Sequence, residues 1–146
     1  MIVNLKSPTD LSGFYVVYEG STNLEKPGWY GLSHLSEHLL CKTFDHLQED
    51  FDRDGIDWNA YTSSNEIVFY LTGLDEKVNK YKNQFVELLT SFNVTKEEFE
   101  NERKIVLEEY MDCFNDQSQS HMLNLSRKLF NDYDPTGAIY MPPTNN

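Results

Sequence analysis

Two histidines and a glutamate, His34, Glu37 and His38, stand within one turn of each other in a segment with an apolar helical pattern. Residues three and four positions apart share one face of an α-helix, so these side chains project to the same side. Two neutral imidazoles at this spacing can bind one metal ion, and a carboxylate beside them can take a proton from a water molecule that the metal activates. The alternative is a plain solvated helix face, but two histidines with an intervening glutamate favour a metal site.

The helix that carries this H-x-x-E-H pentapeptide is expected to run from Gly31 to about Leu47. At about 100° per residue, leucines form a stripe nearly opposite the histidines. We expect this stripe to anchor the helix to a sheet, with the histidine face turned into a cleft or into water. Its members are Leu32, Leu35, Leu39 and Leu47, with Leu40 on its flank.

A third ligand is needed, because catalytic zinc usually has three protein ligands and a water. The candidates lie on a second helix, expected over residues 96–114. Glu102 and Glu109 are two turns apart on one flank, at the border of its apolar face, whereas Glu108 lies almost opposite that face and should be solvated. A partly buried carboxylate needs a partner, which favours Glu109 as the ligand. The apolar face is predicted to consist of Phe99, Val106, Leu107, Tyr110, Cys113 and Phe114.

The remaining elements complete the order β-β-α-β-α-α-α. Period-two patterns of β-branched and aromatic residues predict strands over 1–5, 13–20 and 58–72. Ile67, Phe69 and Leu71 share one face of the last strand. Further helices are expected over 75–92 and 118–134, an acidic turn over 48–57, and a capping box of Thr95 and Glu98 before the helix at 96. This order indicates an α+β fold with helices packed on one face of a sheet.

Composition limits the classes of partner. The chain has 146 residues, one domain's worth, and a formal net charge of −12. This charge argues against nucleic acid and anionic membrane surfaces, which demand basic faces. We expect no nucleic-acid and no membrane partner; a basic or unfolded polypeptide fits better, although the acidity is equally explained by solubility. No apolar stretch approaches the roughly 20 residues that span a bilayer.

The cysteines and the N-terminus bear on location. Cys41 and Cys113 do not make a disulfide framework and are expected to be reduced. No signal peptide is visible, so a cytoplasmic location is expected. Cys41 follows His38 closely and is a rival metal ligand, but a partly buried structural thiol is favoured. Trp29 and Trp58 could line a pocket or pack in the core, and the core is favoured.

Four stretches, in order, resemble the insulinase/pitrilysin (M16) metallopeptidases. They are Gly20-Ser21 with Glu25, the segment 31–40 around H-x-x-E-H, Asn59-Ala60-Tyr61-Thr62-Ser63, and the segment 102–109. Four motifs in the right order are more specific than one pentapeptide. The resemblance covers about residues 1–137, and residues 138–146 read as an irregular tail.

The resemblance implies a role for each matching residue. His34, His38 and Glu109 would bind zinc, and Glu37 would be the general base. Glu102 would lie outside the ligand set and orient a histidine ligand. An extended peptide would bind at a sheet edge, where it can add as another strand; the alternative is an ordinary edge strand. The edge residues are Asn59, Ala60 and Tyr61.

The resemblance also implies an activity and a missing part. The expected activity is zinc-dependent hydrolysis of extended peptides by a mostly antiparallel α+β domain, truncated relative to the family domain. Family domains usually pair with a second homologous half or a partner subunit that closes a chamber, so we expect a homo-oligomer or a partner subunit. The alternative is a peptidase-derived binding or assembly module, catalytically weak or inactive, completed by another subunit. A third option is a metal-binding structural domain.

Overall fold

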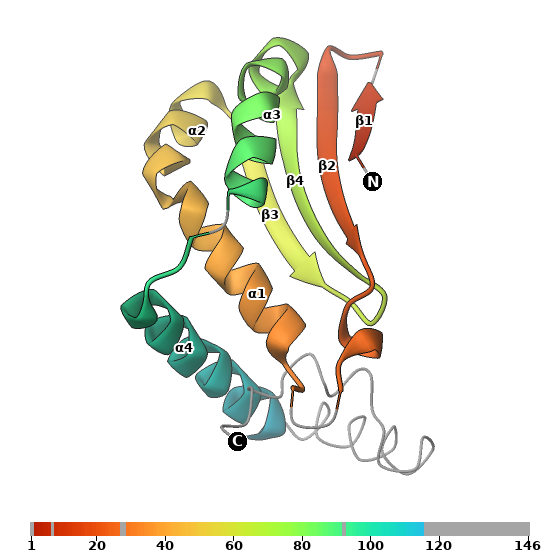
Figure 1. The fold of residues 1–146 in the computed structure, drawn as a ribbon. Coiled ribbons are helices and arrows are strands. Elements are labelled where there is room, and N and C mark those ends of the chain that lie inside the picture. Colours follow the sequence, from red (N-terminus) through yellow and green to blue (C-terminus); the bar gives the residue numbers. More distant parts are fainter. Residues whose placement is uncertain (1, 7, 27–28, 92, 116–146) are drawn as a thin grey trace.

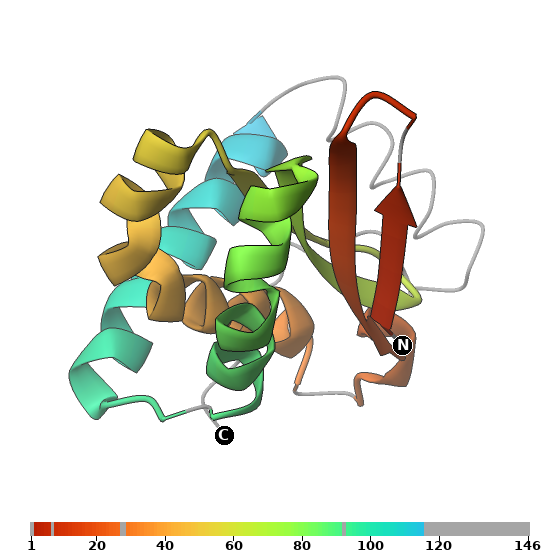
Figure 2. The same cartoon turned by 90° about the horizontal axis from the view of Figure 1, so that it is seen from above.

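A four-stranded antiparallel sheet forms one layer of the fold, with strand order β1-β2-β4-β3. The computed structural model describes residues 2–6, 8–26, 29–91 and 93–115. Figures 1 and 2 show the α-helices of this part on one side of the sheet. The predicted α+β class, with an antiparallel sheet and helices on one face, is confirmed. The strands are β1 (Ile2–Lys6), β2 (Leu11–Glu19), β3 (Asp57–Thr62) and β4 (Glu66–Leu74).

Strands β3 and β4 form a hairpin, so the prediction of one extended segment over 58–72 is wrong. The Ser63 N–H donates to the carbonyl oxygen of Glu66 at 2.8 Å. The Ser63 hydroxyl oxygen accepts from the N–H groups of Asn65 and Glu66 at 3.3 and 3.2 Å. Short polar residues make such turns by bonding their own backbone. The hairpin places β3 at the edge of the sheet, paired on one side only.

The first helix is shorter than predicted. After α1 (Leu32–Cys41) the chain tightens into the 3₁₀ helix η2 (Lys42–Leu47). A further helix, α2 (Gln48–Asp54), replaces most of the predicted acidic turn because Phe51 is fully buried and draws this segment onto the core. It ends at Gly55, whose φ of +67° is a left-handed conformation that glycine adopts readily.

The last two described helices agree with the predictions. They are α3 (Asp75–Thr90) and α4 (Lys96–Asn115). The capping box is confirmed, since the Thr95 N–H donates to Glu98 at 2.8 Å and the Glu98 N–H donates to the Thr95 hydroxyl at 3.2 Å. The predicted helix over 118–134 and the tail over 138–146 lie outside the described residues.

The main core lies between the sheet and the helices. Phe44 stacks on Phe85 with ring centroids 4.6 Å apart, and the half-buried Trp58 packs against Phe44 at 5.1 Å, on the border of the core that the sequence favoured for it. Within the described part of the chain, no helix is long and apolar enough to cross a membrane. The buried members of the core include Phe14, Val16, Leu40, Leu47, Phe51, Ile67, Phe69, Leu71, Val78, Tyr81 and Leu89, among them the predicted β4 face.

Candidate metal centre

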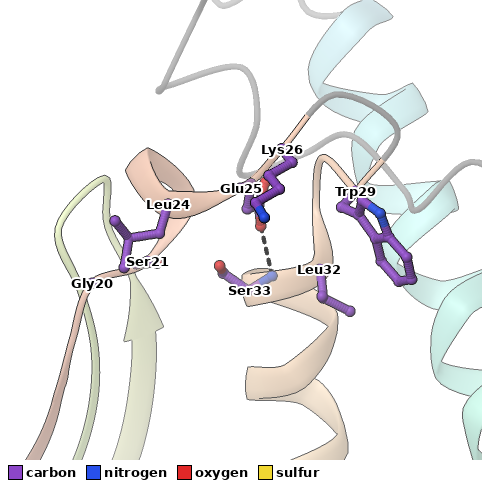
Figure 3. A pocket seen from close by; sticks show the side chains of 8 residues that line it. All are labelled: Gly20, Ser21, Leu24, Glu25, Lys26, Trp29, Leu32 and Ser33. Atoms are coloured by element: carbon purple, nitrogen blue, oxygen red, sulfur yellow. Dashed lines mark hydrogen bonds between the residues drawn. The ribbon is translucent and has the colours of Figure 1, made fainter.

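The start of α1 is fixed by Glu25, which follows the 3₁₀ helix η1 (Thr22–Leu24). The Glu25 carboxylate accepts hydrogen bonds from the N–H groups of Gly31 at 2.8 Å and Ser33 at 2.7 Å, the latter drawn in Figure 3. The first N–H groups of a helix lack partners within it, and the helix dipole favours negative charge there. Because His34 directly follows Ser33, the Glu25 cap also sets where the first imidazole lies.

The leucines of α1 pack in two directions, which corrects the single sheet-facing stripe. Leu35 and Leu39 pack away from the main core, in a second cluster completed by Val106, Val94 and Phe99. Leu40 instead joins the main core, and Leu32 is 37% exposed. Helix α1 therefore lies between the sheet and α4 (Figure 1), and His34 is buried rather than open to water.

Three side chains from α1 and α4 converge on one point. The Nε2 atoms of His34 and His38 are 3.2 Å apart. Oε2 of Glu109 lies 3.5 Å from Nε2 of His34 and 3.4 Å from Nε2 of His38. The two imidazole planes are nearly perpendicular, at 87°. The fold thus brings together the three residues that the sequence nominates as ligands.

These three donors fit a zinc ion. In a tetrahedral zinc site with bonds of about 2.0–2.1 Å, neighbouring donor atoms lie about 3.3–3.5 Å apart. The separations of 3.2, 3.4 and 3.5 Å agree with that geometry. Two imidazole nitrogens and one carboxylate oxygen are also a known catalytic donor set, which leaves a fourth position for water.

Glu102 contacts His38 from the far side of the ring. Its Oε2 lies 3.3 Å from Nδ1 of His38, and an ionised carboxylate only accepts hydrogen bonds, so this contact favours the tautomer with the proton on Nδ1. The Nε2 lone pair of His38 is then free to face Glu109 and His34. Glu102 is 4% exposed, which makes it a buried residue rather than the border residue predicted.

The rest of the α4 apolar face also differs from the prediction. Val106 is fully buried as expected, but Leu107 is 39% exposed. Glu108 is exposed, as predicted. The buried side of α4 is set by its contact with α1, and Glu102 occupies it together with Val106. Phe99 and Tyr110 are half-buried, and the side chains of Cys113 and Phe114 lie outside the described part.

Glu37 stands beside the converging donors without joining them. It is half-buried, and the Thr62 hydroxyl at the end of β3 donates a hydrogen bond to its Oε2. Burial is the main cause that raises the pKa of Glu37, while the Thr62 bond and His38 act in the opposite direction. Thr62 falls within the motif over 59–63, but the prediction assigned it no contact with Glu37, because a hairpin position cannot be read from periodicity.

The predicted peptide-binding residues lie on edge strand β3. Because Ser63 bonds Glu66 at the turn, the alternation of an antiparallel ladder directs the N–H and C=O groups of Ala60 and Thr62 to the free edge. The Ala60 N–H is accepted by the side-chain oxygen of Asn59 at 2.8 Å. Asn59 and Tyr61 are exposed. These residues therefore lie on a strand that is paired on one side only.

Two other residues near α1 have clear surroundings. Cys41 packs at the border of the main core, where burial raises the pKa of its thiol to about 12, and it is not among the three donors that converge. Trp29 is 59% exposed, which overturns its predicted core position. With Leu24, Leu32 and Lys26 it lines a hollow of about 420 Å³ beside the start of α1 (Figure 3).

Comparison with known families identifies the chain. The family model of insulinase (peptidase family M16) matches residues 4–143. The chain belongs to this family, which confirms the resemblance noted from its motifs.

Known proteins match this chain over part of their own length. The probable mitochondrial-processing peptidase subunit beta of Arabidopsis thaliana is 24% identical over 98% of this chain and 27% of its own length. An uncharacterized zinc protease of Bacillus subtilis is 30% identical over 74% of this chain and 28% of its own. The chain therefore spans about a quarter of the length of these relatives.

Solved structures agree on the fold. A protease from Helicobacter pylori matches with a TM-score of 0.73 at 22% identity, over 99% of this chain and 38% of that one. Pitrilysin matches with a TM-score of 0.66 at 19% identity, over 89% of this chain and 15% of its own. A peptidase M16 inactive domain from Pseudomonas fluorescens reaches 0.73 at 10% identity, over 99% and 39% of the two chains.

Proposed function

We propose that this chain forms the zinc-binding part of a peptidase active site that hydrolyses extended peptides. The observation that supports it best is the convergence of His34, His38 and Glu109 at separations of 3.2–3.5 Å, with Glu37 alongside but outside the set. The relatives named as zinc proteases support the choice of metal. A zinc ion held there supplies Lewis acidity, which polarises a peptide carbonyl and acidifies water.

Glu37, Thr62 and Glu102 have separate roles in the proposed reaction. Glu37 accepts the proton of the attacking water and passes it to the leaving amine. Burial raises its pKa above that of an exposed carboxylate. Thr62 holds one carboxylate oxygen of Glu37, and Glu102 holds the tautomer of His38 that presents Nε2 to a metal.

The substrate we propose is an extended segment of peptide added to the edge of β3. The edge-facing backbone groups of Ala60 and Thr62 supply main-chain hydrogen bonds once the substrate displaces the Asn59 oxygen from the Ala60 N–H, and such bonds require an unfolded segment of substrate. Since Thr62 also contacts Glu37, a strand bound along this edge passes close to the proposed base. Asn59 and Tyr61 offer exposed side chains along the same strand.

A second subunit or domain is part of the proposal. The chain spans about a quarter of its curated relatives, and one relative is named as a subunit of a processing peptidase. We propose that a partner subunit or a second copy of the chain completes the substrate chamber.

A non-catalytic module is the second candidate. The inactive domain from Pseudomonas fluorescens has the same fold, so the fold by itself does not carry activity. The presence of His34, Glu37, His38 and Glu109 together argues for the first candidate, because an assembly module has no need to keep all four.

Metal content and hydrolysis test the proposal together. Purified full-length protein should hold about one zinc per chain. His34→Ala should remove the zinc, whereas His46→Ala, which changes an exposed histidine of η2, should keep it. Glu37→Gln should keep the zinc and lose hydrolysis of an unstructured fluorogenic peptide. A wild-type protein without zinc contradicts the metal site, and a zinc-loaded protein without hydrolysis, alone or with its partner, supports the assembly module.

A further inference from the structure

Lys42 lies one helical turn beyond His38, where α1 passes into η2. Its Nζ is 3.6 Å from Oε1 of Glu102, and the other oxygen of the same carboxylate is 3.3 Å from Nδ1 of His38. Glu102 therefore stands between an ammonium group and a proposed zinc ligand. These three side chains line one wall of a hollow of about 330 Å³ that also reaches Glu37.

The burial of Glu102 explains why it needs this cation. Its side chain is 5% exposed, and a buried carboxylate is costly unless charge and hydrogen bonds compensate it. A neutral imidazole offers Glu102 one hydrogen bond and no charge. The Lys42 ammonium supplies the opposite charge, with its own side chain 45% exposed to water.

Asp45 competes for the same ammonium. Its Oδ2 lies 3.1 Å from Nζ of Lys42, closer than Glu102 does, and its side chain is 63% exposed. An exposed ion pair of this kind stabilises little, because water screens it. The Lys42 ammonium therefore affects the buried Glu102 carboxylate more than it affects the exposed Asp45 carboxylate.

We propose that Lys42 is a positioning residue of the metal centre: it holds the Glu102 carboxylate where it accepts the His38 Nδ1 proton, and so directs Nε2 of His38 towards the metal. This inference rests on the proposed zinc site.

The direction in which zinc affinity changes when Lys42 is removed distinguishes a positioning role from direct repulsion between the Lys42 charge and the zinc ion. A lysine near a zinc ion repels it, so removal of the lysine should tighten zinc binding if charge alone acts. Removal should weaken zinc binding if Lys42 acts through Glu102 and His38. Partners outside the ligand set typically change metal affinity by about 10- to 100-fold. Lys42 is one contact further out, so we expect a loss of about 3- to 10-fold.

Zinc affinity of the full-length protein, measured by competition with a chromophoric chelator, tests this. Lys42→Met should weaken affinity about 3- to 10-fold, and Lys42→Arg should stay within about twofold of the wild type. Asp45→Asn should keep or tighten affinity, because it leaves the ammonium to Glu102. Lys104→Met is the matched control: it removes the same charge from the exposed side of α4, two residues from Glu102, and should not weaken binding.

A second readout needs no metal. In the zinc-free protein, nitrogen NMR shifts should show the Nδ1-protonated tautomer of His38 in the wild type. In Lys42→Met they should show a mixture of the Nδ1-protonated and Nε2-protonated tautomers. Unchanged or tighter zinc binding by Lys42→Met, with an unchanged His38 tautomer, overturns the positioning role while the metal site stands. A wild type that binds no zinc overturns the metal site itself and this role with it.

Discussion

Removal of the Glu25 carboxylate should destabilise the protein at the start of α1. Glu25→Ala deletes two charge-assisted hydrogen bonds, of 2.8 and 2.7 Å, to the N–H groups of Gly31 and Ser33. We allow about 1 kcal/mol for each bond, since water can partly replace the carboxylate. Loss of the favourable charge at the helix N-terminus adds about 0.3–1 kcal/mol. The expected loss is therefore about 2–3 kcal/mol in the free energy of unfolding.

Urea unfolding of the zinc-free protein measures this loss. Glu25→Gln keeps one carbonyl oxygen as an acceptor and should lose about half as much. Glu49→Ala is the control, because Glu49 is an exposed glutamate in the first turn of α2, and it should stay within about 0.5 kcal/mol of the wild type. Zinc affinity should fall with Glu25→Ala, because His34 lies in the first turn that Glu25 holds. If Glu25→Ala and Glu49→Ala have equal effects, the cap does not fix the start of α1.

Two further predictions concern Thr62 and Asp54. Thr62→Val should lower kcat about tenfold, the equivalent of one lost hydrogen bond to Glu37, with little change in KM and with recovery in Thr62→Ser; equal activity of the Val and Ser variants would refute this role. Lys80, Tyr81 and Lys77 lower the pKa of Asp54, so its contribution to stability is present above pH 4 or so and is lost as the pH falls. The difference in unfolding free energy between wild type and Asp54→Asn should therefore shrink on acidification from pH 6 to pH 3, and a constant difference would contradict it.

Local features of the site are those that the sequence predicts best. The spacing of His34 and His38 fixes their common face within one helix, and Thr95 and Glu98 form their capping box within four residues. Such features depend on the geometry of a single helix. The meeting of Glu109 with the histidines depends on how α4 packs on α1. The border position of Glu109 and the family motif predict that it is a ligand. They do not predict where its carboxylate lies relative to the histidines.

The wrong predictions have a common physical origin in tertiary contacts. Helical periodicity identified an apolar side of α4 that included Leu107, yet Leu107 is 39% exposed and Glu102 is buried. Rules that place carboxylates on the surface hold unless a partner is present, and the partners of Glu102 are His38, 64 residues earlier in the chain, and Lys42 at the start of η2. The run Ser63-Ser64-Asn65 marks the hairpin turn, but the apolar alternation on both sides of it favours one continuous strand.

The placement of α4 has a consequence for the mechanics of the fold. In the described part of the chain, α4 meets α1 through the polar groups of the metal centre and through one apolar cluster, formed by Leu35, Leu39, Val94, Phe99 and Val106. An ion shared by His34, His38 and Glu109 would join two distant stretches of the chain as a removable cross-link. Chelation would then remove one tie between α1 and α4 and leave the apolar cluster and the Glu102–His38 contact in place, so loss of the metal would weaken the attachment of α4 more than it weakens the sheet and its main core.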